Sequence, residues 1–223
     1  MGQKAVCLLS GGLDSATVLY EARHQGYEVF ALTISYGQLH GREIESARAL
    51  ASGLKIEHRL LTCDLSWKGS ALLDPRIPIP SGSESPPKDH IPSTYVPGRN
   101  SIFLALASSW AEAIGAEAVF IGANAVDYSG YPDCRPEYLE AMEKVFRIGT
   151  KAGIEGRAVR IIAPLVRMTK AEIIRRGQAL KVPFEKTWSC YRGGKIPCGD
   201  CDSCLLRARG FREAGWKDPL VPA

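Results

Sequence analysis

Residues 8–15 read Leu-Leu-Ser-Gly-Gly-Leu-Asp-Ser, and this stretch decides the fold. An apolar run over 5–9 leads into it, and apolar residues at helical spacing, from Leu13 to Ala22, lead out of it. The pattern predicts a strand, a glycine-rich turn and a helix. Two adjacent glycines permit a sharp turn and leave space for a ligand. Because the first N–H groups of a helix lack partners within it, the turn favours phosphate or pyrophosphate.

The polar residues of this turn indicate which phosphate site it is. Ser10 and Ser15 add hydroxyl donors, and Asp14 is suited to hold Mg²⁺ beside the phosphates because hard cations prefer oxygen ligands. A Walker A loop is excluded, since the Gly-Lys pair at 194–195 is followed by Ile196. The turn resembles the pyrophosphate loop of the ATP-pyrophosphatase family, whose enzymes transfer AMP to a substrate oxygen and release pyrophosphate.

Size and composition describe an ordinary globular chain. It has 223 residues, of which 45% are hydrophobic and 23% charged, with a net charge of +4. This mild excess of positive charge suits the binding of small anions and gives no strong signature of nucleic-acid binding. The sequence shows neither a charged-then-apolar leader nor an apolar run near the length of a membrane span. We therefore expect a cytoplasmic protein that binds neither membrane nor nucleic acid.

Strand and helix patterns alternate along the rest of the chain. Further strands are predicted over 28–34, 55–61, 118–122 and 159–163, and helices over 43–52, 102–114 and 137–148. This alternation predicts an α/β fold with a doubly wound parallel sheet, whose ligands bind beyond the carboxyl ends of the strands. We expect residues 1–186 to form the ATP-pyrophosphatase domain and residues 187–223 a small zinc-binding helical segment.

Residues 62–100 interrupt the alternation and hold half of the 14 prolines. A loop of this length is typically functional, and we expect a lid or a subunit arm. It ends at Arg99, just before a predicted helix, where a guanidinium suits a phosphate better than it suits the helix dipole. Lys170 has the same position in a later helix, which the capping box of Thr169 and Glu172 predicts. The alternative for both cations is an ordinary solvated side chain.

Residues 122–136 follow a predicted strand and are dense in polar and aromatic groups. Carboxylates there would act as base or metal ligand, aromatic rings would stack on a substrate, and a thiol and a guanidinium would touch it. The alternative is turn chemistry without a ligand, with an inert buried cysteine. The candidates are Asp127, Asp133, Tyr128, Tyr131, Cys134 and Arg135.

Four cysteines with the spacing Cys-x₇-Cys-x₂-Cys-x₂-Cys lie near the C-terminus, at Cys190, Cys198, Cys201 and Cys204. Four thiolates this close in sequence can surround one tetrahedral Zn²⁺ and leave no coordination position open, which predicts a structural metal. An iron–sulfur cluster is the alternative, because ferredoxins also contain Cys-x₂-Cys-x₂-Cys.

Several short strings occur together in one order: the 10–15 loop, Tyr36-Gly37-Gln38, and the segments 95–100, 124–135 and 190–204. With this set the chain resembles, over nearly its whole length, the 7-cyano-7-deazaguanine synthase family of the queuosine pathway. The resemblance implies that 7-carboxy-7-deazaguanine, ammonia and ATP with Mg²⁺ give the nitrile through an adenylated carboxylate and an adenylated amide. It also implies one zinc ion on the four cysteines and a homodimer.

The resemblance further implies roles for individual residues. Phosphate contacts are expected from Arg99 and Lys170, and catalytic roles from Asp14, Asp127, Asp133 and Cys134. The deazapurine is expected to lie against Tyr36, Asn124, Tyr128, Tyr131 and Arg135. ATP is expected to lie on one continuous segment, which comprises Leu8, Leu9, Ser10, Gly11, Gly12, Leu13, Asp14, Ser15, Ala16, Thr17 and Val18.

Two other functions remain open from the sequence. One is an ATP-pyrophosphatase that modifies tRNA, for example by thiolation, and the other is a zinc-stabilised nucleotide- or RNA-binding module without turnover. Release of pyrophosphate distinguishes an enzyme from a binding module. Because the chain has no second domain that would make ammonia from glutamine, we expect free ammonium as the nitrogen source.

Overall fold

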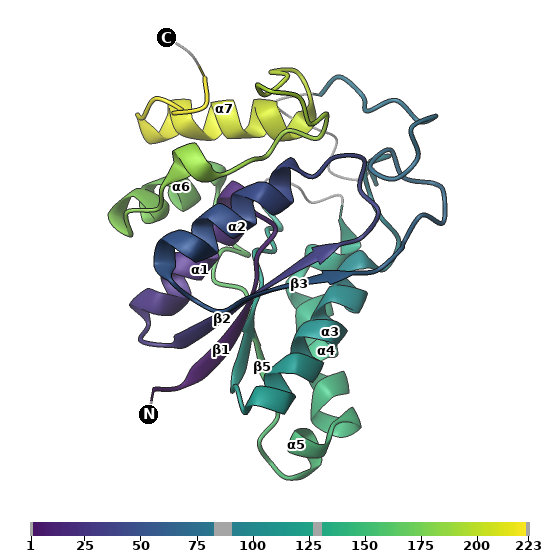
Figure 1. Ribbon diagram of the computed structural model, residues 1–223, viewed down its shortest axis with the longest axis vertical. Helices are drawn as coiled ribbons and strands as arrows, with labels where there is room; N and C mark the ends of the chain where they lie inside the picture. Colours follow the sequence, from purple (N-terminus) through teal and green to yellow (C-terminus); the bar gives the residue numbers. More distant parts are fainter. Residues whose placement is uncertain (1, 83–90, 127–130, 222–223) are drawn as a thin grey trace.

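The computed structural model describes residues 2–82, 91–126 and 131–221 of the chain. Its centre is a sheet of five parallel strands in the order β3-β2-β1-β4-β5 (Figure 1). In this order β1 lies in the middle, so the turn after β1 is at the centre of the carboxyl edge. The strands are β1 (Lys4–Leu8), β2 (Glu28–Ser35), β3 (His58–Thr62), β4 (Ala118–Phe120) and β5 (Arg160–Ile162).

Helices cover both faces of the sheet (Figure 1). Alternate residues of β1 divide between two cores, since Ala5 and Cys7 pack with α1, α2, α6 and α7, whereas Val6 and Leu8 pack with α3 and α4. Burial on both faces explains why the inner strands read as continuous apolar runs. The helices are α1 (Leu13–His24), α2 (Arg42–Leu54), α3 (Arg99–Ile114), α4 (Pro136–Gly149), α5 (Lys151–Ile154), α6 (Lys170–Ala179) and α7 (Asp202–Ala214), with short 3₁₀ turns η1 (Pro132–Cys134) and η2 (Phe184–Lys186).

The predicted doubly wound parallel sheet is confirmed, and all five predicted strands are present. The boundaries differ by one to three residues, and the largest difference is at β3. Lys55 has φ = 54° and ends α2 in the left-handed conformation, so the chain becomes extended only near His58. The capping box predicted for Thr169 and Glu172 is present in full at the start of α6.

The long connection between β3 and α3 packs against the body of the protein over much of its described length. Leu65, Leu72, Leu73 and Val96 are buried in the core on the α3 side of the sheet. Residues 79–82 lie beside the cysteine-rich segment, to which Gly82 donates a backbone hydrogen bond at Asp200 O (2.6 Å). The described parts of the predicted lid or arm therefore form part of the wall around the carboxyl edge.

The C-terminal segment packs on the same core as α1. Phe211 of α7 contacts Phe184 edge-on, with ring centroids 5.5 Å apart, and both belong to the core that contains Ala5 and Leu19. The boundary predicted between residues 186 and 187 stays a prediction. In the described part of the chain, no helix is both long and apolar enough to cross a membrane.

Candidate active site

The turn after β1 is stabilised by hydrogen bonds of its own serine hydroxyl groups. Gly11 has φ = +90°, and a side chain there would overlap the backbone of Glu43 in the first turn of α2. Ser15 Oγ accepts a hydrogen bond from Gly11 N (3.2 Å), and Ser10 Oγ lies 3.0 Å from Ser15 Oγ. Sequence and structure agree here, because glycine is required at the turn and α1 begins directly after it.

A cavity of about 300 Å³ opens at this turn. It lies at the carboxyl ends of β1, β2 and β4, where the predicted ligand site was placed, and its volume is at the lower end of the range for small-molecule pockets. Apolar side chains such as Leu8, Ile34 and Phe103 line part of it. Polar groups converge on it from several parts of the chain, among them Ser10, Asp14, Glu43, Arg99, Asn124, Tyr131, Lys170 and Ser189.

Asp14 and Lys170 form an ion pair on this cavity. The Lys170 Nζ donates to both carboxylate oxygens of Asp14 at 2.7 Å, and the two side chains are 28% (Asp14) and 12% (Lys170) exposed. The chain positions of the partners differ by 156 residues. A partly buried, bidentate pair is held more firmly than a surface pair, so the lysine that was expected to contact phosphate is fixed beside the glycine-rich turn.

Arg99 also lines the cavity, from the first residue of α3. Its Nη1 donates to Tyr36 Oη (3.3 Å), and its guanidinium lies 5.6 Å from the centre of the Tyr36 ring. Burial acts against the charge of Arg99, but Tyr36, Tyr131 and Asp133 outweigh it and raise the pKa of this guanidinium. A permanent cation therefore faces the cavity, as expected for an anion-binding site.

Glu43 is a cavity residue that the sequence analysis missed. It lies in the first turn of α2, and burial raises the pKa of its carboxyl to about 7, against a smaller opposing effect of Arg99. His40 lines the same wall, and burial lowers the pKa of its imidazole. The only sequence signal for Glu43 was a first-turn acidic residue, which is common at exposed helix starts.

The segment after β4 divides into residues that line the cavity and residues that support it. Tyr131 lines the cavity and shares a hydrogen bond with Thr94 (2.8 Å). Asn124 also reaches it, while its amide donates to Leu165 O (3.0 Å) and Met168 O (2.6 Å) and so ties β4 to the loop before α6. Asn124 therefore has a structural task in addition to its expected contact with the substrate.

The next three candidates of this segment differ in whether they reach the cavity: Asp133, Cys134 and Arg135. Asp133 accepts a hydrogen bond from Asn100 N (3.2 Å) at the start of α3 and does not appear in the cavity wall. Cys134 lines the cavity, and burial raises the pKa of its thiol to about 11, so the thiol is protonated at neutral pH. Arg135 is exposed at the start of α4. The other two candidates, Asp127 and Tyr128, lie outside the described residues.

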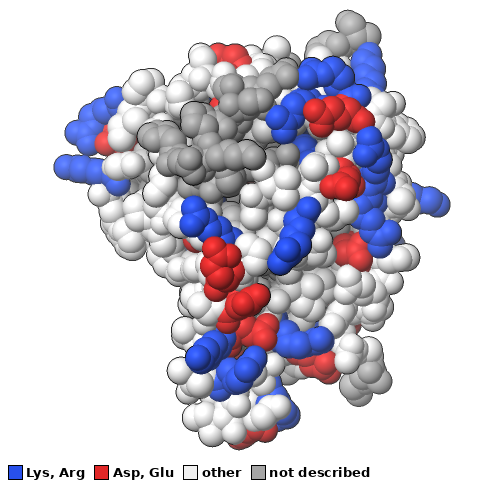
Figure 2. Space-filling model, turned by 180° about the vertical axis from the view of Figure 1, so that it is seen from behind, with Lys and Arg blue, Asp and Glu red and all other residues white. Residues whose placement is uncertain are grey.

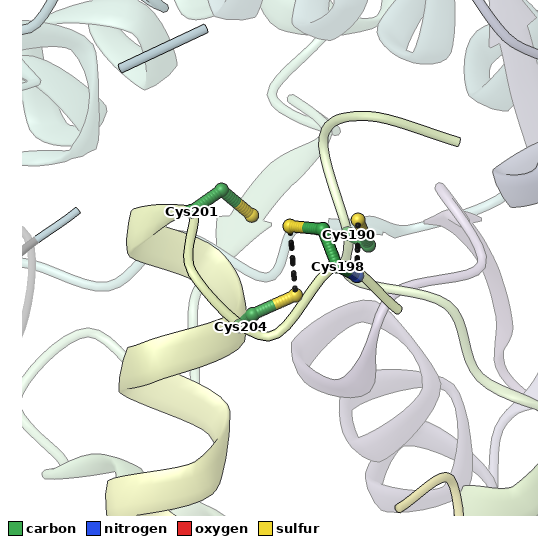
Figure 3. A group of neighbouring side chains, drawn as sticks. All are labelled: Cys190, Cys198, Cys201 and Cys204. Carbon is green, nitrogen blue, oxygen red and sulfur yellow. Dashed lines mark hydrogen bonds between the residues drawn. The ribbon is translucent and has the colours of Figure 1, made fainter. Parts of the chain in front are cut away.

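The four cysteines of the C-terminal motif come together (Figure 3). Their sulfur atoms all lie within 4.8 Å of one another, and Cys198 Sγ is 3.9 Å from Cys204 Sγ. Sulfurs bound at ~2.3 Å to a tetrahedral Zn²⁺ lie ~3.8 Å apart, so the donor set fits such an ion. Cys190 and Cys198 come from the loop before α7, Cys201 is the N-cap residue of α7, and Cys204 lies in its first turn.

This cysteine centre adjoins the cavity. Trp188 N donates to Gly11 O (2.9 Å), which attaches the segment to the glycine-rich turn, and Trp188 and Ser189 line the cavity. The buried Arg207 of α7 donates to Thr187 Oγ1 (2.8 Å) and so attaches the same segment to α7. The centre thus supports one wall of the cavity.

Acidic and basic side chains are interspersed over much of the face drawn in Figure 2, and several basic side chains gather along its upper right edge. The net charge of the chain is +4.

Comparison with known proteins gives a family match over nearly the whole chain. Residues 4–215 match the family described as "Queuosine biosynthesis protein QueC". A relative from Trichodesmium erythraeum, named 7-cyano-7-deazaguanine synthase, is 55% identical over 221 residues, which are 98% of this chain and 100% of the relative. A protein of the same name from Thermoplasma acidophilum is 53% identical over 218 residues, covering 98% of this chain and 91% of the relative.

Solved structures agree with the fold at much lower identity. The NMN synthetase from Francisella tularensis has a TM-score of 0.50 at 17% identity, with 100% of this chain and 80% of that chain covered. The U34-tRNA thiolase NcsA from Methanococcus maripaludis, solved with its [4Fe-4S] cluster, has a TM-score of 0.50 at 17% identity, with 93% and 63% covered. At these identities the likeness concerns the fold alone.

Proposed function

The chain belongs to the QueC family of queuosine biosynthesis proteins, and on this basis we propose that its cavity makes 7-cyano-7-deazaguanine from 7-carboxy-7-deazaguanine, ammonia and ATP. It is an ATP-dependent carbon–nitrogen ligase. The observation that carries the proposal is a glycine-rich turn with two cationic side chains, inside a chain that matches the synthases over 98% of its length.

ATP binds with its phosphates at the 10–15 turn. The N–H groups at the start of α1 and the hydroxyls of Ser10 and Ser15 surround the site. Lys170 and Arg99 both line the cavity and offset phosphate charge. When bound, Mg²⁺ would offset further charge on the leaving pyrophosphate, and Asp14 would hold it through a carboxylate oxygen.

The deazapurine lies in the part of the cavity lined by aromatic side chains. Tyr36 and Tyr131 line this part, and Tyr36 packs edge-on against Phe103 with centroids 5.5 Å apart. Asn124 and Cys134 complete this wall, and the protonated thiol of Cys134 favours contact rather than nucleophilic attack. Asp127, Tyr128, Asp133 and Arg135 stay predictions as site residues.

The chemistry needs two activations at one carbon atom. A carboxylate oxygen attacks the α-phosphorus of ATP and pyrophosphate leaves, which makes the oxygen a good leaving group. Ammonia adds to the carbonyl carbon, a proton is lost and AMP departs to give the amide. The amide oxygen then attacks the α-phosphorus of a second ATP and pyrophosphate leaves. Departure of AMP with the oxygen atom and loss of both N–H protons give the nitrile. Glu43 faces this cavity with a pKa of about 7, which suits a proton acceptor near neutral pH.

The four cysteines hold a structural zinc ion in this proposal, because their sulfur spacing leaves no place for a reacting water. We also assign free ammonium as the nitrogen source and a homodimer as the assembly. The cytoplasmic location expected from the sequence stays a prediction.

A product assay tests the proposal. Purified protein with ATP, Mg²⁺, ammonium and 7-carboxy-7-deazaguanine should give the nitrile by mass spectrometry, with AMP and pyrophosphate formed only when the substrate is present. ATP binding without any product, or AMP release that depends on tRNA, would contradict it.

A matched pair of variants adds a control. Asp14→Asn should reduce turnover by at least 100-fold, because it weakens both the Lys170 pair and the expected Mg²⁺ site. Glu137→Gln also changes an acidic residue in the first turn of a helix, α4, but that residue is exposed and lies outside the cavity wall. It should retain full activity.

A further inference from the structure

Gly210 of α7 stands where a glycine is otherwise unfavourable. It is buried within a regular helix, where glycine costs about 0.5–1 kcal/mol relative to alanine. It has no left-handed backbone conformation that would require glycine. Its presence therefore needs a reason from its neighbours.

The reason is the side chain of Lys170. A Cβ atom built at Gly210 overlaps Lys170 Cγ and lies only 2.9 Å from Lys170 Cβ and from Ile174 Cδ1. These two lysine carbons are close to the α6 backbone, so the clash cannot be relieved by moving the flexible end of the side chain. Either Lys170 changes its rotamer or α6 moves away from α7.

Gly210 also belongs to the face of α7 that borders the cavity. Ser203, Leu206 and Arg207 line the cavity, and position 210 continues this series at helical spacing. The stem of Lys170 crosses the helix at the gap that Gly210 leaves, and its Nζ reaches both oxygens of Asp14 at 2.7 Å.

On the basis of the proposed function, we infer that Gly210 is a positioning residue, which lets the Lys170 stem lie on α7 and so aims its ammonium group at Asp14 and the phosphates of ATP. Gly210 touches neither the cavity nor the nucleotide. It acts only through Lys170, and a larger residue at this position displaces the ammonium group while leaving the glycine-rich turn intact.

Equilibrium binding of a non-hydrolysable ATP analogue, without the carboxylate substrate, tests this inference. Gly210→Ala should weaken binding by about tenfold to 100-fold, the range for loss of one charge-assisted hydrogen bond. In a Lys170→Ala background the overlapping Cγ is absent, so adding Gly210→Ala should weaken binding by less than twofold. This non-additivity identifies action through Lys170, whereas a purely structural role predicts additive losses.

Gly177→Ala is the matched control. Gly177 is a buried glycine in α6. A Cβ atom there overlaps Phe184 Cζ and does not meet Lys170. This variant should lower the unfolding temperature and leave affinity for the analogue unchanged. Loss of affinity in Gly177→Ala equal to that in Gly210→Ala would overturn the inference, because general loosening of the packing around α6 would then explain both.

Other outcomes separate this inference from the proposed function. Gly210→Ala with wild-type affinity, or an equal loss in the presence and absence of the Lys170 side chain, overturns the role of Gly210 alone. A wild-type chain that binds the analogue but makes no nitrile overturns the substrate assignment and leaves the binding comparison valid. A wild-type chain that binds no ATP overturns both.

Discussion

The buried ion pair between Arg207 and Asp218 gives a quantitative prediction for Asp218→Asn. The two side chains are 5% and 7% exposed, and Arg207 donates from Nε to Asp218 Oδ2 (2.7 Å) and from Nη2 to Oδ1 (3.0 Å). Two charge-assisted hydrogen bonds are each worth about 1.5–3 kcal/mol, and removing one partner of a buried pair costs about 3–5 kcal/mol. Arg207 retains hydrogen bonds to Thr187 and Phe184, so we expect a loss of stability at the lower end of the second range.

The free energy of unfolding of Asp218→Asn should therefore fall by about 3 kcal/mol, and Tm by about 6–12 °C for a chain of this size. Urea denaturation followed by circular dichroism, with metal-saturated protein at constant pH, measures this change. Glu45→Gln breaks an exposed pair with Arg42 and should cost less than 0.5 kcal/mol.

A second variant identifies the physical cause. Replacing both partners, with Arg207→Met and Asp218→Leu together, removes both buried charges and should destabilise less than Asp218→Asn alone. If Asp218→Asn costs no more than Glu45→Gln, the reasoning from burial and bidentate geometry is refuted.

Three further predictions concern the metal centre, a titrating carboxyl and the glycine-rich turn. Cys201→Ser should reduce bound metal below one equivalent by elemental analysis and lower Tm, while Cys63→Ser, outside the centre, retains the metal. Glu43 has a folded-state pKa of about 7, above its ordinary 4.5, so the wild type loses stability as pH rises through this interval. Glu43→Gln removes that loss, so its stability relative to the wild type, from urea midpoints, should be higher at pH 8 than at pH 5. Gly11→Ala should abolish ATP binding in calorimetry because its Cβ overlaps α2, whereas Gly26→Ala, with φ = +89° and open space, should lose stability but bind ATP.

The sequence was most informative where local pattern and burial agree. β1 and β2 are covered on both faces, so their apolar runs were visible, and the turn between β1 and α1 followed from adjacent glycines. The rule that parallel strands place their carboxyl ends at one edge then located the cavity before any contact was known. The cysteine centre was equally clear, because its four ligands lie within 15 positions of one another.

The sequence was least informative where a residue acts through distant contacts. Nothing local indicates that Lys170 pairs with Asp14, 156 positions away, or that Gly210 leaves the space for it. The expected role of Asp133 as base or metal ligand stays a prediction. Its carboxylate accepts a hydrogen bond from Asn100 N at the start of α3, and nothing in the local sequence indicates this contact across 33 positions.

The arrangement of α7 explains how the cysteine centre is linked to the proposed ATP site. Cys201 and Cys204 lie at the N-cap and in the first turn of α7, and its last turns contain Gly210 and Phe211, which pack on Lys170 and the core. A helix is rigid over this length, so fixing its first turn also fixes the position of Gly210 relative to α6. Trp188, two residues before the first cysteine, donates its backbone N–H to Gly11 O. The cysteine centre is therefore also attached to the glycine-rich turn. The four cysteines, which are not among the residues that line the cavity, thus help to determine where two parts of the proposed ATP site lie.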